Sequence, residues 1–151
     1  MVYDALEMTF REIKVRKDPA GEPITELIDY EAFCGVVSVE AQEAAAGSTI
    51  TAAELKKMLD DGDPIDLIDV REPAEWEIVR IPGAVLIPKG DLPGKLAELP
   101  QDRPIVAYCK TGIRSAEALA LLKQAGFADA KHVQGGVTAW ATQVDKSQPV
   151  Y

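Results

Sequence analysis

The sequence has few of the residues that build metal centres and disulfide frameworks. Its 151 residues include two cysteines and one histidine. A closed zinc site needs four ligands, usually cysteine and histidine, so no such site is expected. The N-terminus also lacks the apolar segment of a secretory signal. A disulfide between Cys34 and Cys109 is therefore not expected.

Long apolar runs, excess positive charge and nucleotide-binding motifs are also missing. No apolar run approaches the roughly 18 residues that a membrane-spanning helix requires, so no membrane partner and a cytoplasmic location are expected. The formal net charge of −9 argues against nucleic acid as a main partner, because phosphate contacts need a basic face. Neither GxGxxG nor GxxxxGK[ST] occurs, so we predict no ATP site.

From residue 49 onward, helical and strand-like patterns alternate. Thr51 and Glu54 have the spacing of a capping box, which predicts a helix that ends near Gly62. Apolar runs predict strands over residues 65–70, 84–87, 105–108 and 131–133. Helices are predicted over residues 92–99, 115–124 and 137–144, with a short helix or turn over 74–79. This alternation is typical of an α/β fold with a mainly parallel sheet.

The N-terminal part has a different character. Residues 1–18 contain a strand-like run whose alternation slips between Phe10 and Ile13, which suggests a bulge. Residues 24–37 fit a helix or irregular structure equally well. Residues 39–47 are small and polar and predict a linker that is at most transiently helical. These segments hold too little apolar material to form a core alone.

Cys109 is the strongest candidate for chemistry. It follows the apolar run 105–108, and the short loop Lys110-Thr111-Gly112-Ile113-Arg114 leads from it into a helix near Ser115. Loop N–H groups, the positive end of a helix and two basic side chains all favour an anion at this point. Such a setting favours a thiolate, a persulfide or a bound oxyanion. Gly112 allows the tight turn, and Ile113 is expected to anchor the loop in the body.

The length of the loop separates two classes of cysteine enzyme. A cysteine phosphatase needs five residues between cysteine and arginine, whereas four separate Cys109 from Arg114. A smaller ring suits one sulfur atom better than a phosphate. The thiolate would accept sulfur as a persulfide and then release it, which is two-step covalent catalysis.

Four further residues have structural or supporting interpretations. Asp69, at the end of a predicted strand, is expected to cap a loop or pair with an arginine rather than to act as a general base, and Arg71 is expected to form an ion pair rather than to bind substrate. His132 is interpreted as structural, and Cys34 as a small buried hydrophobe without a basic neighbour.

Residues 49–151 resemble a rhodanese domain. The resemblance rests on the segments LIDVRE (67–72), IPGA (81–84), CKTGIRS (109–115) and GGVTAW (135–140), in this order and spacing. It implies a five-stranded sheet with helices on both faces and assigns the persulfide to Cys109. It also implies loop or anion-binding roles for residues 110–114 and supporting roles for Asp69, Arg71 and Ser115. Arg80 stands where the family often has histidine.

Residues 1–37 are similar to the C-terminal end of an E1-like adenylyltransferase of the MoeB/MoeZ type. Residues 1–48 are therefore interpreted as a residual adenylyltransferase tail with a linker. The resemblance implies an adenylating partner domain and a ubiquitin-like sulfur-carrier protein as acceptor, in molybdopterin, thiamine or cysteine biosynthesis. Many relatives have zinc-binding CxxC pairs in this tail, but residues 17–25 have none, so we predict no zinc and no other cofactor.

The sequence thus predicts a rhodanese-type sulfurtransferase. The sulfur donor, a small molecule or a protein, is left open. Two alternatives also stay open: a phosphatase with the rhodanese fold, and an interaction module without catalytic activity.

Overall fold

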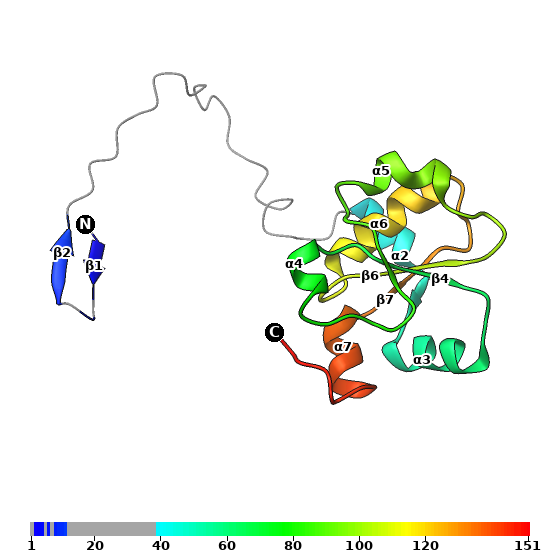
Figure 1. The fold of residues 1–151 in the computed structure, drawn as a ribbon. Helices are drawn as coiled ribbons and strands as arrows, with labels where there is room; N and C mark the ends of the chain where they lie inside the picture. Colours follow the sequence, from blue (N-terminus) through cyan, green and yellow to red (C-terminus); the bar gives the residue numbers. More distant parts are fainter. Residues whose placement is uncertain (1, 5, 7, 12–38) are drawn as a thin grey trace, which may run out of the picture.

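The computed structural model describes residues 2–4, 6, 8–11 and 39–151 (Figure 1). Near the N-terminus, β1 (Val2–Asp4) pairs antiparallel with β2 (Thr9–Arg11). The strand-like run expected near Phe10 is therefore one arm of a hairpin. The suggested bulge before Ile13, the segment 24–37 and Cys34 lie outside the described residues.

The segment expected to be a linker contains a helix. α2 (Val39–Ala45) packs against α6 (Ile113–Gln124), and the side chain of Ala41 is buried. The small side chains of its alanines allow the two helices to pack closely. The same alanines gave the segment the small, polar composition that predicted a linker. The boundary between residues 48 and 49 stays a prediction, although α2 packs on the body that follows it.

Five parallel strands form the central sheet. Their order is β3-β7-β6-β4-β5, and every neighbouring pair is parallel. The strands are β3 (Thr49–Ile50), β4 (Asp66–Asp69), β5 (Val85–Leu86), β6 (Ile105–Tyr108) and β7 (Lys131–Val133). All four residues of the central strand β6 are buried, as expected of a strand covered on both faces. The predicted five-stranded, mainly parallel α/β sheet is confirmed.

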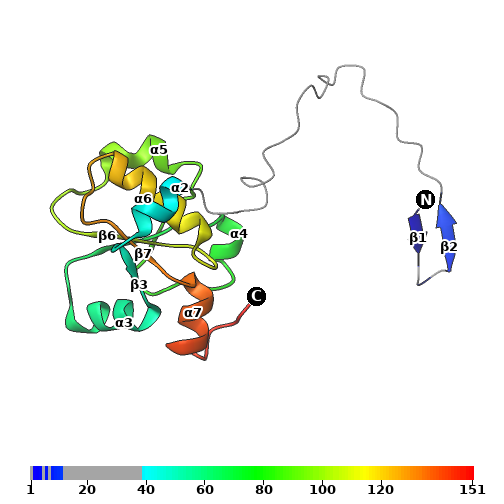
Figure 2. The ribbon, with the colours of Figure 1, turned by 180° about the vertical axis from the view of Figure 1, so that it is seen from behind.

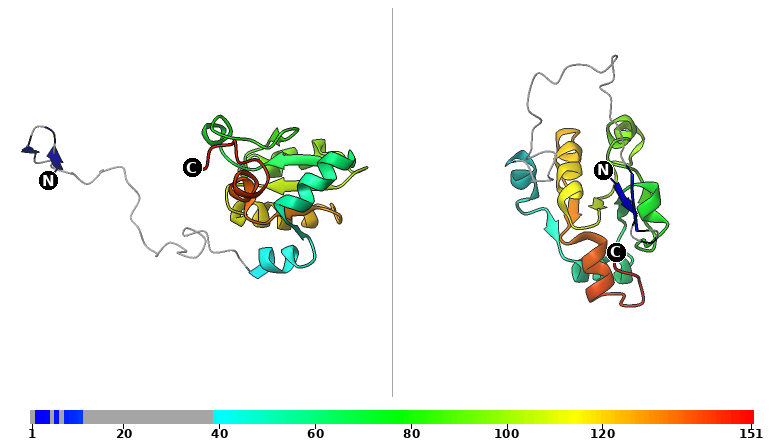
Figure 3. Two further views of the ribbon diagram at one scale, coloured as in Figure 1. Left: turned by 90° about the horizontal axis from the view of Figure 1, so that it is seen from below. Right: turned by 90° about the vertical axis from the view of Figure 1, so that its left-hand side faces the viewer.

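Helices cover both faces of the sheet. α3 (Ala52–Asp61) and α7 (Gly136–Gln143) lie on one face, and α2, α5 (Leu92–Lys95) and α6 on the other (Figure 1 and Figure 2). The 3₁₀ turn η1 (Leu96–Glu98) continues α5, and α4 (Pro73–Trp76) follows β4. Figure 3 gives two further views of these layers. Among the described residues, no helix has both the length and the apolar character that crossing a bilayer demands.

Successive side chains of β6 point to opposite faces of the sheet and belong to two separate hydrophobic cores. Ile105, Ala107 and Cys109 belong to the core beneath α6, whereas Val106 and Tyr108 belong to the core beneath α3 and α7. Cys109 therefore enters its loop with its side chain on the α6 side. Because all five strands are parallel, the loops that follow them meet at one edge of the sheet, where α/β folds place reactive groups.

Candidate active site

Cys109 follows β6 directly, and the residue is only 1% exposed. The backbone N–H of Gly112 donates a hydrogen bond to Cys109 Sγ at 3.1 Å. α6 begins at Ile113, two residues earlier than expected, with Gly112 as its N-cap. The sulfur therefore lies against a backbone donor at the positive end of a helix, which favours negative charge on it.

Gly112 adopts a conformation that other residues rarely adopt. Its φ is +106°, and a Cβ at this position would lie 3.3 Å from Gly135 N and 3.5 Å from Val133 O. Glycine is required here both for the left-handed backbone and for the close approach of the next loop. This turn brings the Gly112 N–H onto the thiol.

The first turn of α7 holds the other side of the loop. The N–H of Val137 donates to Cys109 O at 2.8 Å, and that of Thr138 donates to Lys110 O at 3.1 Å. Gly136 is in close contact with the same carbonyls, since a Cβ there would lie 2.1 Å from Cys109 O. The loop is thus closed between the N-termini of α6 and α7, which explains why the GGVTAW segment accompanies the cysteine loop.

Ser115 and His132 support the loop from inside the protein. Ser115 Oγ donates to Gly112 O at 3.1 Å and lies 3.3 Å from His132 Nδ1. The other ring nitrogen of His132 lies 3.0 Å from Thr49 Oγ1. Burial lowers the pKa of His132, which favours the neutral ring. Both ring nitrogens have hydroxyl partners, consistent with the structural interpretation of this residue.

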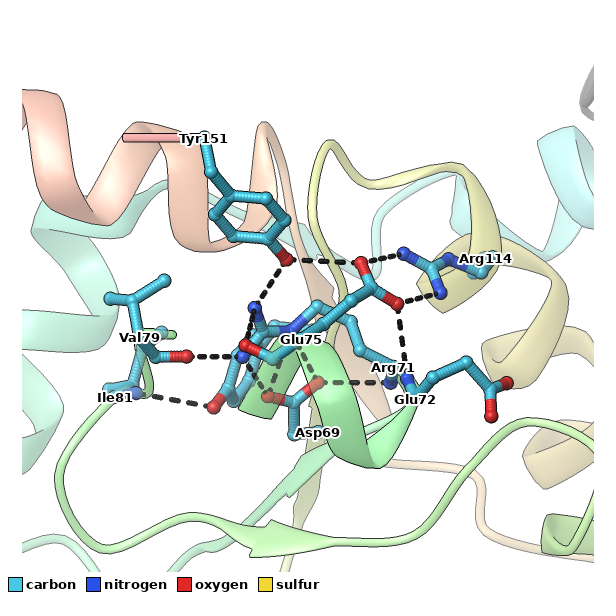
Figure 4. A network of polar contacts seen from close by, with 9 residues as sticks. Asp69, Arg71, Glu72, Glu75, Val79, Ile81, Arg114 and Tyr151 are labelled. Carbon is cyan, nitrogen blue, oxygen red and sulfur yellow. Dashed lines mark hydrogen bonds and ion pairs between the residues drawn. The ribbon is translucent and has the colours of Figure 1, made fainter. Parts of the chain in front are cut away.

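Asp69 and Arg71 form a fully buried ion pair (Figure 4). Arg71 Nε lies 2.9 Å from Asp69 Oδ1, and Nη2 lies 2.5 Å from Oδ2. Nη2 also donates to Val79 O at 2.6 Å, which ties the segment after α4 to the end of β4. Burial by itself would lower the pKa of Arg71, but the bonds and charge of Asp69 raise it above its ordinary value.

Arg114 is bound by a residue that the sequence analysis did not single out. Its Nη1 and Nη2 donate to the two carboxylate oxygens of Glu75 at 2.6 and 2.7 Å (Figure 4). This pairing is the main cause that lowers the pKa of Glu75 to about 2. Glu75 also accepts the N–H of Glu72 at 3.1 Å, across the first turn of α4. Its position three residues after Glu72 could suggest a helix cap, but nothing local indicates the ion pair.

Tyr151 is the second residue that sequence reasoning missed. Its hydroxyl group accepts from Arg71 Nη1 at 2.7 Å and donates to Glu75 Oε1 at 3.0 Å. Its ring centroid lies 4.2 Å from Lys110 Nζ. An isolated tyrosine far from the loop in sequence gives no signal for these contacts.

The other predicted loop residues lie at the surface. Thr111 is exposed, and Ile113 is 36% exposed. The expectation that Ile113 anchors the loop is wrong, because this residue opens α6 and remains at the surface. The carbonyl bonds from α7 hold the loop instead. The roles assigned to residues 110–114 in binding an anion stay predictions.

An apolar cleft lies beside the loop. Its volume is about 380 Å³, and its lining residues come from α2, from the loop, from the first turn of α6, from β7 and from the turn after β7: Ala45, Thr111, Gly112, Ile113, Ala116, His132, Gln134 and Gly135. Within the described part of the chain, no three histidine, cysteine, aspartate or glutamate side chains are placed to hold a metal ion. The groups at the site are the Cys109 thiol, the backbone N–H of Gly112, and two arginines, Arg71 and Arg114, that are each paired with a carboxylate.

Comparison with known proteins identifies relatives of both parts of the chain. The probable adenylyltransferase/sulfurtransferase MoeZ of Mycobacterium tuberculosis is 59% identical over 153 residues, which cover 100% of this chain and 39% of that protein. A sulfurtransferase of Allochromatium vinosum is 38% identical over 92 residues, covering 61% of this chain and 86% of that protein. The resemblance to the C-terminal part of a fused adenylyltransferase and sulfurtransferase is thus confirmed.

The solved structures support the fold. A rhodanese-like domain protein from Staphylococcus aureus superposes with a TM-score of 0.60 at 33% identity, covering 69% of this chain and 98% of that one. Residues 51–143 match the family described as the rhodanese-like domain. This match includes the cysteine loop, the Asp69–Arg71 pair and the glycine turn before α7. The chain belongs to the rhodanese-like domain family.

Proposed function

We propose that this chain is a sulfurtransferase that carries sulfur as a persulfide on Cys109. The observation that carries the proposal is the Gly112 N–H bond to Cys109 Sγ, in a loop closed by the N-termini of α6 and α7. Fixed backbone dipoles of this kind stabilise a thiolate, and they would equally stabilise the terminal sulfur of a persulfide. The names of the relatives, which include sulfurtransferases, support the same activity.

The first half-reaction needs a donor with a sulfane sulfur, for which thiosulfate is the simplest probe. The Cys109 thiolate attacks the outer sulfur and forms a new S–S bond. The S–S bond inside the donor breaks, and its electron pair leaves with sulfite. No proton moves in this step, so the site needs no general base and no cofactor held by this chain.

For the second half-reaction we infer an acceptor whose C-terminal carboxylate has been adenylated, such as a ubiquitin-like sulfur-carrier protein. The outer persulfide sulfur attacks the acyl carbon, and the adenylate leaves. A small thiol then attacks Cys109 Sγ and releases the thiocarboxylate, and a second thiol molecule restores the Cys109 thiolate as a disulfide of the small thiol is formed. The fused adenylating domain of the relatives supports this acceptor class.

Mass spectrometry after incubation with thiosulfate tests the proposal. We expect the wild-type chain to gain the mass of one sulfur atom and Cys109→Ala to gain none. Cys34→Ala is the matched control, since it removes the other cysteine of the chain and should retain the adduct. An adduct that survives in Cys109→Ala, or no adduct in the wild type, would contradict the proposal. Turnover of an aryl phosphate without any sulfur adduct would favour the phosphatase alternative.

A further inference from the structure

Tyr151 lies where two ion pairs of the site meet. Its hydroxyl group accepts a hydrogen bond from Arg71, which is paired with Asp69, and donates one to Glu75, which is paired with Arg114 (Figure 4). The two pairs come from the end of β4 and the residues that follow it, from α4 and from α6. The phenol thus links the buried pair after β4 to the carboxylate that holds the arginine at the start of α6, beside the bond that Arg71 Nη1 donates to the backbone carbonyl of Glu75 at 3.3 Å.

The bond to Glu75 reaches the cysteine loop through a short path. Oε1 of Glu75 accepts from both Tyr151 and Arg114 Nη2, so the phenol holds one of the two carboxylate oxygens that bind the guanidinium. Arg114 lies in the first turn of α6, two residues after Gly112, whose N–H contacts the thiol. Displacement of Glu75 would therefore be felt at the N-terminus of the helix that supports the sulfur.

The ring of Tyr151 acts on the other end of the loop. Lys110 Nζ lies 4.2 Å from the ring centroid, within the range of a cation–π contact. Lys110 follows the cysteine directly, and its backbone carbonyl is held by α7. One side chain therefore contacts Lys110, the first residue of the loop, and, through Glu75, Arg114, the last.

We propose that Tyr151 is a positioning residue for the active-site loop. The hydroxyl group holds the Glu75 carboxylate, and through it Arg114, in place. The ring holds the ammonium group of Lys110. Tyr151 does not touch the sulfur, so its effect passes through these neighbours. The inference rests on the proposed function where it concerns sulfur transfer by Cys109. The expected effect of Tyr151 on the reactivity of the Cys109 thiol can be measured without a sulfur donor.

Two variants separate the contributions of Tyr151. Tyr151→Phe keeps the ring and removes the bonds to Arg71 and Glu75, whereas Tyr151→Leu removes the ring as well. Val150→Ala is the matched control, because Val150 is its neighbour and is 58% exposed. All variants are made in the full chain carrying Cys34→Ala, so that Cys109 is the single thiol.

The first readout is the rate at which iodoacetamide alkylates Cys109 as a function of pH. We expect Tyr151→Phe to slow alkylation at pH 7 by about threefold, because the loop that supports the sulfur is held less well. The second readout is persulfide formation from thiosulfate. Tyr151→Leu should raise the KM for this anion by about tenfold, more than Tyr151→Phe, since Lys110 is no longer held.

Thermal unfolding separates positioning of the loop from a purely structural contribution of Tyr151 to the fold. If the variants lower only the melting temperature and leave both the alkylation profile and the donor kinetics at the values of Val150→Ala, the inference is overturned. The proposed function fails separately, when the parent chain alkylates normally at Cys109 but takes no sulfur from the donor. In that case the alkylation profiles still decide whether Tyr151 positions the loop.

Discussion

At the scale of single residues, Gly136 shows how closely two segments approach behind the thiol. A Cβ on Gly136 would lie 2.1 Å from Cys109 O and 2.6 Å from Lys110 O, and both atoms belong to backbone that α7 already holds. Neither atom is the end of a flexible side chain that could move aside. The same glycine has a φ of +54°. Both the lack of space for a Cβ and the positive φ therefore require glycine at this position.

Gly136→Ala is expected to lower the free energy of unfolding by about 3 kcal/mol or more, because relief of the clash must move the loop backbone. Gly126→Ala is the matched control: Gly126 has a φ of +97° but open space around its Cβ position. It should cost about 1–2 kcal/mol, from the left-handed backbone alone. Denaturant unfolding measures both values. Equal losses in the two variants would show that the close approach to Cys109 has no energetic weight.

At the scale of elements, α6 and α7, the two helices whose first turns face the cysteine loop, begin differently from α3. α6 and α7 start at glycines with positive φ, without a side-chain cap, and their first turns face the cysteine loop. α3 starts with a complete capping box, in which Thr51 N donates to Glu54 Oε2 at 2.7 Å and Glu54 N to Thr51 Oγ1 at 3.2 Å. A side-chain cap satisfies the start of α3, and Glu75 likewise accepts the N–H of Glu72 at the start of α4, whereas the N-termini of α6 and α7 bond to the cysteine loop.

Thr51→Ala should lower the free energy of unfolding by about 1 kcal/mol through loss of this cap. Alkylation of Cys109 should keep its wild-type rate, since α3 contributes none of the hydrogen bonds described around the loop. Thr142→Ala, an exposed threonine within α7, is the control and should change stability by less than about 0.5 kcal/mol. A fall in alkylation rate with Thr51→Ala would show that α3 and the site are coupled.

At the scale of the whole molecule, the site places basic side chains in an acidic chain. The formal net charge is −9, yet Arg71 and Arg114 each have a carboxylate partner at the edge of the sheet where the loops meet. The pair of Glu75 and Arg114 joins α4 to α6 across 39 positions, so its charge state contributes to the stability of the folded protein. The pH dependence of unfolding therefore reports on the site.

Glu75 makes this dependence measurable. Its pKa in the folded protein, about 2, is below its ordinary value, mainly because Arg114 binds it. A lowered carboxylate pKa means that the stabilisation is present at neutral pH and is lost as the pH falls from about 4 towards 2. The wild type should exceed Glu75→Gln in unfolding free energy by about 1–2 kcal/mol at pH 6, a value reduced by solvent screening.

Denaturant unfolding of both proteins at pH 6 and at pH 2.5 provides the measurement. We expect the difference between them to shrink at the lower pH, where Glu75 of the wild type begins to take up its proton. A difference of the same size at both values would show that the pair with Arg114 contributes no charge-dependent stability. The part of the difference in unfolding free energy between the wild type and Glu75→Gln that does not change with pH reports on the hydrogen bonds that glutamine cannot replace.

The sequence by itself was sufficient for the features that depend on neighbouring residues. The alternation of apolar runs and helical patterns indicated the parallel sheet, and the order of strand, cysteine, glycine and helix indicated the loop around Cys109. The Thr51–Glu54 cap was equally local. Hydrogen-bonding rules and periodicity act over a few residues, so such features can be read from the chain directly.

Only the tertiary structure decided which groups surround the loop. Glu75 meets Arg114 across 39 positions, and Tyr151 meets Arg71 across 80. The helix Val39–Ala45 is also explained by its packing on α6, since its composition alone suggested a linker. These contacts exist because the parallel sheet brings the ends of distant segments to one edge, and no pattern of neighbouring residues encodes which side chains meet there.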